Sequence, residues 1–448
     1  MGARVHPDSA IAAVDAANFA LEGSQPNVVT LVALFAPGGW VDREGDADVG
    51  RLRRALDARV RGIEALCRRP VERHGDWRWE AATPDLAHHV RVLDGPGRAG
   101  VADAPESLEA VCARVVMQPL AADRPPWELL LVPRARPGRC ALLIRLHHAV
   151  ADGLAAEALV GALADPDAPV DGAAEGATVG KPRSGEPRSG EPRSGEPRAA
   201  EPGPRGIRSI ASRGARIVVQ VAAVFRRSVR SRTLLGPLGA TRDVAFGEVD
   251  LRALHDGARR LGGTVNDAFL AAYGQGIRAV LLAAGEPLPE RVPISNPVRL
   301  DRRAGEGNAT GVMLVGVPVD PDDVRPVVAR VAATTRSAAA RARREGTFEL
   351  MRGPRVAALL MRFATTQRAV GAIASNLPGP GRALRIDGAE LEAAWPLSLL
   401  SGNVRLGVVG LSYAGCFRFG VQTDADHLPP ARMVAEAITS SLRRIAAA

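Results

Sequence analysis

The chain has 448 residues, 46% of them hydrophobic and 24% charged, which is typical of globular proteins and allows two or three domains or one two-lobed enzyme. Its net charge of +9 comes almost entirely from arginine, because Lys181 is the only lysine, and the abundance of Arg, Ala and Gly is most simply a codon bias. Only 4% of the residues are aromatic, which leaves few side chains for stacking on bases. We therefore expect no nucleic-acid partner.

Some kinds of site and segment are also not expected. The four cysteines show no CxxC or metal-ligand spacing, so no disulfide scaffold and no metal site are predicted, and a reducing cytoplasm is indicated. Asp8 and Asp15 lie where a signal peptide would be basic, and no run of about 18 apolar residues that would span a membrane occurs. Contact with lipid is therefore expected only at a surface.

The predicted elements begin with Val28–Phe35, an apolar run that favours a buried strand. Val49–Leu66 has apolar residues near helical spacing and predicts a helix, with Asp48 as its N-cap. His88-His89 is followed by V-R-V-L-D, and we interpret this pair as part of a strand. Ala141–Leu146 predicts a second buried strand.

That second strand leads into the most informative motif, Leu143–Gly153, which reads L-I-R-L-H-H-A-V-A-D-G. Two adjacent histidines end the strand, and Asp152-Gly153 opens an Ala-rich helix at Leu154–Leu163. A chance HHxxxDG in a chain with so few histidines is about a one-in-a-thousand event. A histidine at the mouth of a strand is held rigidly with one face free, which a general base requires.

Each residue of this motif has a functional and a plain interpretation. His148 is the candidate base, because a neutral imidazole with a pKa near 6.5 accepts a proton at cytoplasmic pH, or it merely closes the strand. His147 points to the opposite side of an extended backbone, so structural support is expected. Asp152 pairs with an arginine that fixes the loop, or caps the following helix as an N-cap. Gly153 completes the turn.

The composition changes at about 166–206, where three copies of S-G-E-P-R lie in a Pro/Gly/Ala-rich stretch. Such a segment buries too little apolar area to offset its ordering entropy, so a disordered linker is predicted. It separates an N-terminal lobe, residues 1–165, from a C-terminal lobe, residues 207–448. The second lobe begins with the basic segment Ile207–Arg232, which predicts either a helix in an anionic lipid interface or a helix that packs between the lobes.

Further along, Gly263–Ala283 predicts a helix with Thr264 as its N-cap. Leu406–Ser412 and Cys416–Thr423 predict a hairpin around Ala414-Gly415, and a closing helix follows at Pro430–Ile445. Strands and helices are mixed in both lobes, so the fold class is α/β or α+β.

Seven blocks in order give the chain a family resemblance. HHxxxDG is the signature of the CoA-dependent acyltransferase superfamily, and the rest resembles the bacterial wax ester synthase/acyl-CoA:diacylglycerol acyltransferase family over nearly the full length. Pro126 departs from the leucine usual in that family. The remaining blocks are V-D-A-A-N-F-A-L-E at Val14–Glu22, P-L-A-A-D-R-P-P-W-E at Pro119–Glu128, G-P-L-G at Gly236–Gly239, T-V-N-D-A-F-L-A at Thr264–Ala271, S-N-L-P-G-P at Ser375–Pro380 and S-Y-A-G at Ser412–Gly415.

The resemblance implies two similar chloramphenicol-acetyltransferase-like lobes with mixed sheets and an active-site channel between them. It implies that His148 is the catalytic base and that Asp152 pairs with an arginine of the second lobe. Arg299 is the best match for that arginine, although its spacing is two residues longer than in the family's PVSxR block.

Other matched positions keep two interpretations. Asn266 and the neighbouring Asp267 match a pair near the channel, or form the polar first turn of a helix. Ser375 or Asn376 donates to the developing oxyanion, or belongs to a plain turn.

The implied reaction is direct acyl transfer without a cofactor, a metal or a covalent enzyme intermediate. Acyl-CoA is the donor co-substrate, and the acceptor is diacylglycerol or a long-chain alcohol. The enzyme is expected in the cytoplasm, in peripheral contact with a membrane or lipid droplet. Two alternatives stay open: a condensation-type or polyketide-associated acyltransferase with a carrier-protein donor, and a catalytically weak lipid-droplet or lipid-binding protein.

Overall fold

The structure is a computed structural model that describes residues 9–11, 15–16, 19, 26–74, 76–93, 106–150, 159–166, 228–299, 310–345 and 365–448. At 298–299, 310–312 and 341–345 only the backbone is described. The described residues before 166 and after 227 belong to one compact unit. The S-G-E-P-R copies and residues 207–227 lie outside the described residues, whereas residues 228–232 are described and are not helical.

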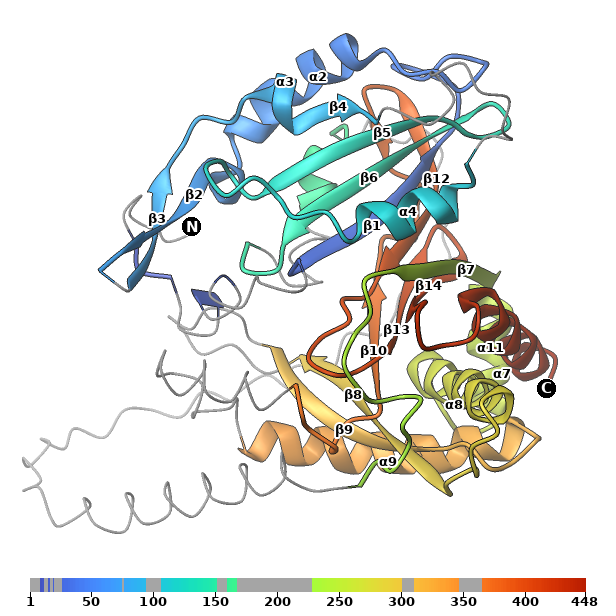
Figure 1. Ribbon diagram of the computed structural model, residues 1–448. Coiled ribbons are helices and arrows are strands. Elements are labelled where there is room, and N and C mark those ends of the chain that lie inside the picture. Colours follow the sequence, from blue (N-terminus) through green and yellow to red (C-terminus); the bar gives the residue numbers. More distant parts are fainter. Residues whose placement is uncertain are drawn as a thin grey trace, which may run out of the picture. The chain divides into compact units, whose positions relative to one another are not determined.

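Two six-stranded mixed sheets form the framework, as the family resemblance implies (Figure 1). In spatial order the first contains β11 (Arg385–Ile386), β12 (Ala389–Leu397), β1 (Val28–Phe35), β6 (Arg139–His147), β5 (Trp127–Arg136) and β4 (Val90–Val92). The second contains β7 (Arg242–Asp250), β14 (Cys416–Asp424), β13 (Leu406–Tyr413), β10 (Ala372–Pro378), β8 (Arg291–Arg299) and β9 (Thr310–Pro318). A separate hairpin joins β2 (Arg68–Arg73) to β3 (Asp76–Ala81).

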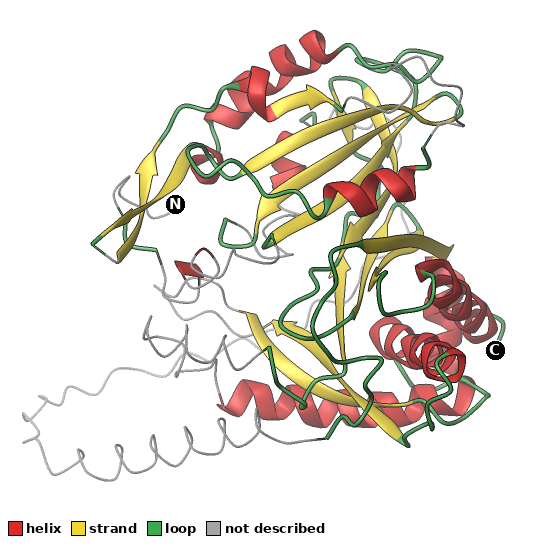
Figure 2. Cartoon of the chain, viewed as in Figure 1, coloured by secondary structure: helices red, strands yellow, loops and turns green. Residues whose placement is uncertain are grey.

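Helices cover both sheets, as Figure 2 shows in red. Against the first sheet lie α2 (Val49–Arg61), the 3-10 turn Glu64–Leu66, α3 (Leu86–His89) and α4 (Leu108–Val115). The second sheet carries α7 (Leu251–Arg260), α8 (Val265–Ala283), α9 (Arg325–Glu345) and α11 (Ala431–Ala446). The largest core lies between these four helices and the second sheet, and α8 runs through it with most of its side chains buried.

Several local predictions are confirmed. Asp48 caps α2, where its carboxylate accepts a hydrogen bond from Arg51 N at 2.8 Å. Strands β13 and β14 form the predicted hairpin, and Ala414 and Gly415 adopt φ angles of 46° and 78°, the left-handed conformation that a tight two-residue turn requires. The closing helix begins one residue after Pro430.

Two predictions are corrected. His88-His89 is not a strand but ends the single-turn helix α3, because the Asp85 carboxylate caps this turn by accepting from Ala87 N at 2.9 Å. The segment predicted as the second lobe, residues 207–448, does not form one lobe alone. Its strand β12 pairs antiparallel with β1 and so completes the first sheet, as Figure 1 shows.

Candidate active site

The HHxxxDG motif begins where β6 ends, in the middle of the first sheet. The ladder between β1 and β6 continues to the last pair, Val28 opposite His147. The next residue, His148, is half-buried, and its backbone N–H donates to the carbonyl of Asn27 at 2.7 Å. The backbone of the candidate base is therefore tied to the neighbouring strand just beyond the sheet.

His147 is buried and held from two sides. Its ring stacks on Phe19 with 4.0 Å between centroids and an interplanar angle of 8°. Its Nδ1 accepts a hydrogen bond from Ala149 N at 3.2 Å. These contacts hold His147 beside the turn that carries His148.

A buried ion pair involves Arg145, which precedes His147 by two residues on β6. Arg145 donates to Glu128, its direct partner on β5, and to the carbonyl of Gln118, and its side chain is 0% exposed. Burial lowers the pKa of Arg145, while Glu128 opposes that shift. Sequence reasoning missed this pair, although an arginine within the apolar run L-L-I-R-L was a visible signal.

The first turn of α8 distinguishes the two residues of the Asn266-Asp267 pair. Thr264 and Asp267 form a capping box, in which Asp267 Oδ2 accepts from Thr264 N at 2.9 Å. The other carboxylate oxygen accepts from Thr335 Oγ1 of α9 at 2.6 Å. Both oxygens of Asp267 thus stabilise the helix start, whereas Asn266 is half-buried on the same turn.

Ser375 and Asn376 are neighbours on β10 and therefore point to opposite faces of the second sheet. Asn376 shares the face of Ala374, which packs in the core beneath the helices. Ser375 shares its face with Leu377, which packs against the core of the first sheet, and with Ile373, which packs against the core of the second. The faces of β10 separate the two candidate oxyanion donors but do not choose between them.

The remaining candidate residues lie partly or wholly outside the part of the chain that the structure describes. Asp152 and Gly153 lie outside the described residues, and Arg299 is described only in its backbone, as the last residue of β8 opposite Thr310. The helix after the motif is described at 159–163. In the described part of the chain no helix is long and apolar enough to cross a membrane.

Comparison with known proteins gives matches along most of the chain. The family model for the wax ester synthase/diacylglycerol acyltransferase catalytic domain matches residues 11–269, and the model for the C-terminal domain of that family matches residues 306–446. The Mycobacterium tuberculosis protein named "Probable diacyglycerol O-acyltransferase tgs1" is 29% identical over 380 residues, which cover 81% of this chain and 80% of the relative.

Two solved structures show the same fold at lower identity. The wax ester synthase/diacylglycerol acyltransferase from Marinobacter aquaeolei VT8 superimposes with a TM-score of 0.68 at 20% identity, covering 98% of both chains. Polyketide synthase associated protein 5 from Mycobacterium tuberculosis superimposes with a TM-score of 0.57 at 17% identity, covering 98% of this chain and 99% of its own.

Proposed function

The chain belongs to the wax ester synthase/diacylglycerol acyltransferase family, and from this premise we propose that it transfers a long-chain acyl group from acyl-CoA to a lipid hydroxyl. The acceptor is diacylglycerol, giving triacylglycerol, or a long-chain alcohol, giving a wax ester. Free CoA is the second product.

The observation that carries the proposal is the position of His148. Its backbone is fixed by Asn27, its neighbour His147 is stacked on Phe19, and the residue itself is half-buried. A histidine held in this way supports the proposal of a general base that acts without a covalent bond to the acyl group.

In the proposed step His148 takes the proton of the acceptor hydroxyl while the hydroxyl oxygen attacks the thioester carbonyl. The new C–O bond forms, the C–S bond breaks, and the same histidine returns the proton to the departing thiolate. Negative charge develops on the carbonyl oxygen, and Ser375 of β10, which shares a face with Leu377, is our candidate donor to it.

Two further roles complete the proposal. Asp152 pairs with Arg299 and fixes the loop after His148, and Asn266 contributes to the channel between the lobes. No cofactor or metal takes part, because a thioester is already activated for attack.

We also propose peripheral contact with a membrane or lipid droplet through the arginine-rich segment Ile207–Arg232. Near an anionic surface each arginine contributes about 1 kcal/mol, screened by salt. Replacing Arg226, Arg227 and Arg230 with Gln should weaken co-sedimentation with anionic liposomes at low salt. Turnover of a water-soluble short-chain substrate should not change. Unaltered liposome binding would rule out this contact and leave the alternative prediction for Ile207–Arg232, a helix that packs between the lobes.

The test is an incubation of purified protein with labelled palmitoyl-CoA and either hexadecanol or dioleoylglycerol, followed by separation of the lipids. Label in wax ester or triacylglycerol supports the proposal and identifies the acceptor. Transfer only from an acylated carrier protein would favour the condensation-type alternative. Lipid binding without transfer from either donor would favour the lipid-binding alternative.

A further inference from the structure

A narrow cavity lies where the two sheets meet, close to the end of the strand that carries the histidines. Its walls include Val28 and Thr30 of β1, Leu397 and Ser398 at the end of β12, Arg242 of β7 and Gln422 of β14. The free space accommodates about one group of the size of a water molecule.

The cavity is a near neighbour of the candidate base along the backbone. Its wall contains Pro26 and Val28, the residues on either side of Asn27, whose carbonyl accepts from His148 N. Val28 is also the direct cross-strand partner of His147. A group bound in the cavity therefore lies against the strand end that holds His148 in place.

Two buried polar atoms of the cavity wall need a ligand. Thr30 is 1% exposed and Gln422 is 5% exposed, and within the described residues neither Thr30 Oγ1 nor Gln422 Oε1 has a hydrogen-bond partner. A buried polar group without a partner costs about 1–3 kcal/mol, so a wall with two of them favours occupation by a polar group.

The hydroxyl of Thr30 selects an acceptor. Thr30 lies directly opposite Arg145 in the β1–β6 ladder and Arg242 lies in the wall, but Glu128 offsets the charge of Arg145 and Asp424 offsets that of Arg242. The ligand is therefore chosen by the Thr30 hydroxyl, which has no acceptor within the described residues and favours an electron-rich oxygen to which it donates. A half-turn of the Gln422 amide exchanges its oxygen for the NH2 group, which is also a donor.

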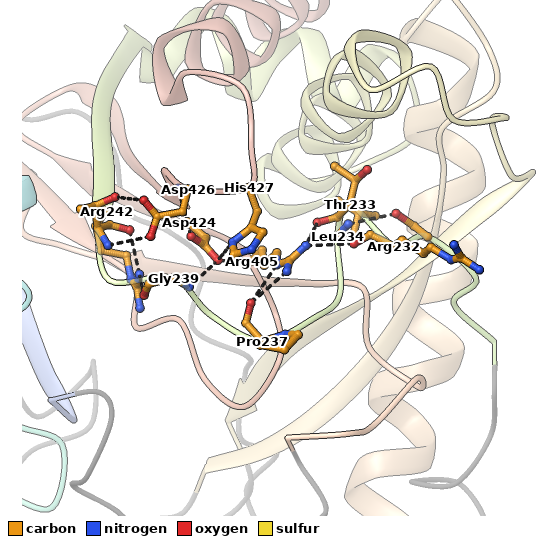
Figure 3. Close-up of polar contacts among 12 residues, drawn as sticks. Arg232, Thr233, Leu234, Pro237, Gly239, Arg242, Arg405, Asp424, Asp426 and His427 are labelled. Atoms are coloured by element: carbon orange, nitrogen blue, oxygen red, sulfur yellow. Dashed lines mark hydrogen bonds and ion pairs between the residues drawn. The ribbon is translucent and has the colours of Figure 1, made fainter.

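Arg242 is held in the wall by a buried polar cluster around Asp424, shown in Figure 3. Arg242 and Asp424 are direct partners in the β7–β14 ladder. Arg242 Nη1 donates to the carbonyls of Gly239 at 2.9 Å and Thr241 at 2.8 Å, and Gly239 N donates to Asp424 Oδ2 at 3.0 Å. This fixes the position of Arg242 and gives a role to the G-P-L-G block.

Arg405 anchors the other end of the same block. Its Nη2 donates to the carbonyl of Pro237 at 2.9 Å, and its Nε lies 3.5 Å from Asp424 Oδ2. Asp424 is 0% exposed and also contacts His427 Nδ1 at 2.9 Å (Figure 3). Hydrogen bonds and ion pairs therefore hold this side of the cavity wall in place, between the G-P-L-G block and the ends of β13 and β14.

We propose that this cavity is a subsite for one carbonyl oxygen of a substrate, which accepts a hydrogen bond from Thr30. The narrow space excludes a phosphate or a ring. The inference rests on the proposed function, which supplies two carbonyl sources: an amide of the pantetheine arm of acyl-CoA, or an ester of diacylglycerol.

The test uses two matched substitutions. Thr30→Val removes the hydroxyl at nearly constant volume, Thr30→Ser retains it, and Gln422→Met removes the second polar atom if Thr30→Val does not fold. We would measure the dissociation constant of CoA by calorimetry, and KM for palmitoyl-CoA, dioleoylglycerol and hexadecanol. Loss of one hydrogen bond should raise the relevant constant by about 2- to 12-fold, with Thr30→Ser near the wild type.

The two sources give different patterns. Weaker CoA binding with a higher KM for palmitoyl-CoA would identify the pantetheine amide. A higher KM for dioleoylglycerol with an unchanged KM for hexadecanol would identify the ester. If Thr30→Val and Gln422→Met both match the wild type in every constant, the cavity holds only water and the inference is wrong.

These outcomes are separable from failure of the proposed function. A wild-type protein that transfers nothing would count against that function alone. Thr30→Val and Thr30→Ser could still be compared by their affinity for CoA. They could also be compared by the shift in melting temperature that dioleoylglycerol or hexadecanol in micelles causes. Equal affinities and equal shifts in that comparison would overturn the subsite.

Discussion

The chain contains two adjacent histidine pairs, His88-His89 and His147-His148, and each has one buried and one half-buried member. In each pair the buried ring is stacked on an aromatic side chain. His89 lies on Trp127 with centroids 4.2 Å apart, and its Nδ1 bonds the Trp127 carbonyl at 2.7 Å. His147 lies on Phe19 at 4.0 Å. The packing of the buried member therefore does not distinguish the two pairs.

The backbone around each pair does distinguish them. His88 and His89 end a single helical turn that leads directly into β4, so the chain passes on through the sheet. His148 follows the last residue of the central strand β6, and its backbone N–H donates to the carbonyl of Asn27 just past the strand end. The two pairs therefore differ in their backbone placement, and only His148 follows the end of a strand, as the proposed base does.

The largest expected effect separates the half-buried members of the pairs. His148→Ala should lower turnover by about 10²–10⁴-fold, the usual contribution of a positioned general base, with the fold retained. His88→Ala is the matched control and should leave turnover near the wild-type value. Acyl transfer and circular dichroism measured together check this. A His148→Ala protein that keeps more than about a tenth of the activity would contradict the role of the base.

The second prediction concerns Asp152, the aspartate of the HHxxxDG motif, which follows His147-His148 and has no counterpart at the same spacing after His88-His89. Asp152→Ala should lower the free energy of unfolding by about 3–5 kcal/mol, the usual cost of removing one partner of a buried ion pair such as the one proposed with Arg299. Arg299→Ala should cost a similar amount, and the double variant should cost less than the sum. Denaturant unfolding of all three variants measures this, and strictly additive losses would mean that the two side chains do not pair.

The sequence was sufficient wherever the cause was local. The Thr264 cap, the Asp48 cap and the turn at Ala414-Gly415 depend on a few neighbouring residues, and all three are confirmed. The strand prediction for His88-His89 is wrong because the alternation V-R-V belongs to the next element, β4, whereas the Asp85 cap starts a helical turn at the two histidines.

Long-range pairing was not accessible in the same way. Nothing within Ala389–Leu397 indicates that this strand joins a sheet formed by residues more than 200 positions earlier. The Arg145–Glu128 pair and the Thr30 cavity also depend on which strands become neighbours. For the site, the motif predicts His148 as the base from local residues, whereas the placement of Ser375 and Asn376 on opposite faces of β10 depends on the sheet.

A smaller effect should appear at the buried member of the active-site pair. His147→Phe keeps a ring to stack on Phe19 but removes the acceptor of the Ala149 N–H. An unsatisfied buried N–H costs about 1–3 kcal/mol, so the free energy of unfolding should fall by this amount. Turnover should fall far less than in His148→Ala. If the two substitutions reduced turnover equally, His147 would have to take part in the chemistry.

The smallest effect concerns the buried member of the other pair and is a dependence on pH. Burial lowers the pKa of His89 below 6.5, while the Trp127 carbonyl opposes this. His89 Nδ1 bonds that carbonyl, and within the described residues His89 Nε2 is buried without a partner, so a second proton has no acceptor.

Because the folded pKa lies below the unfolded one, the unfolded chain binds the proton more readily. The stability contributed by neutral His89 is therefore complete above about pH 6.5 and is lost as the pH falls through the folded pKa. His89→Phe keeps the stack on Trp127 and should remove this loss, flattening the curve by at most about 1.4 kcal/mol per pH unit for one proton. Denaturant unfolding between pH 7 and 5 measures the difference, with His255→Ala, at an exposed histidine of α7 that does not act on the His89 pKa, as the control that keeps the wild-type slope. Equal slopes for wild type and His89→Phe would contradict this prediction, because they would mean that His89 is protonated as easily in the folded protein as in the unfolded chain.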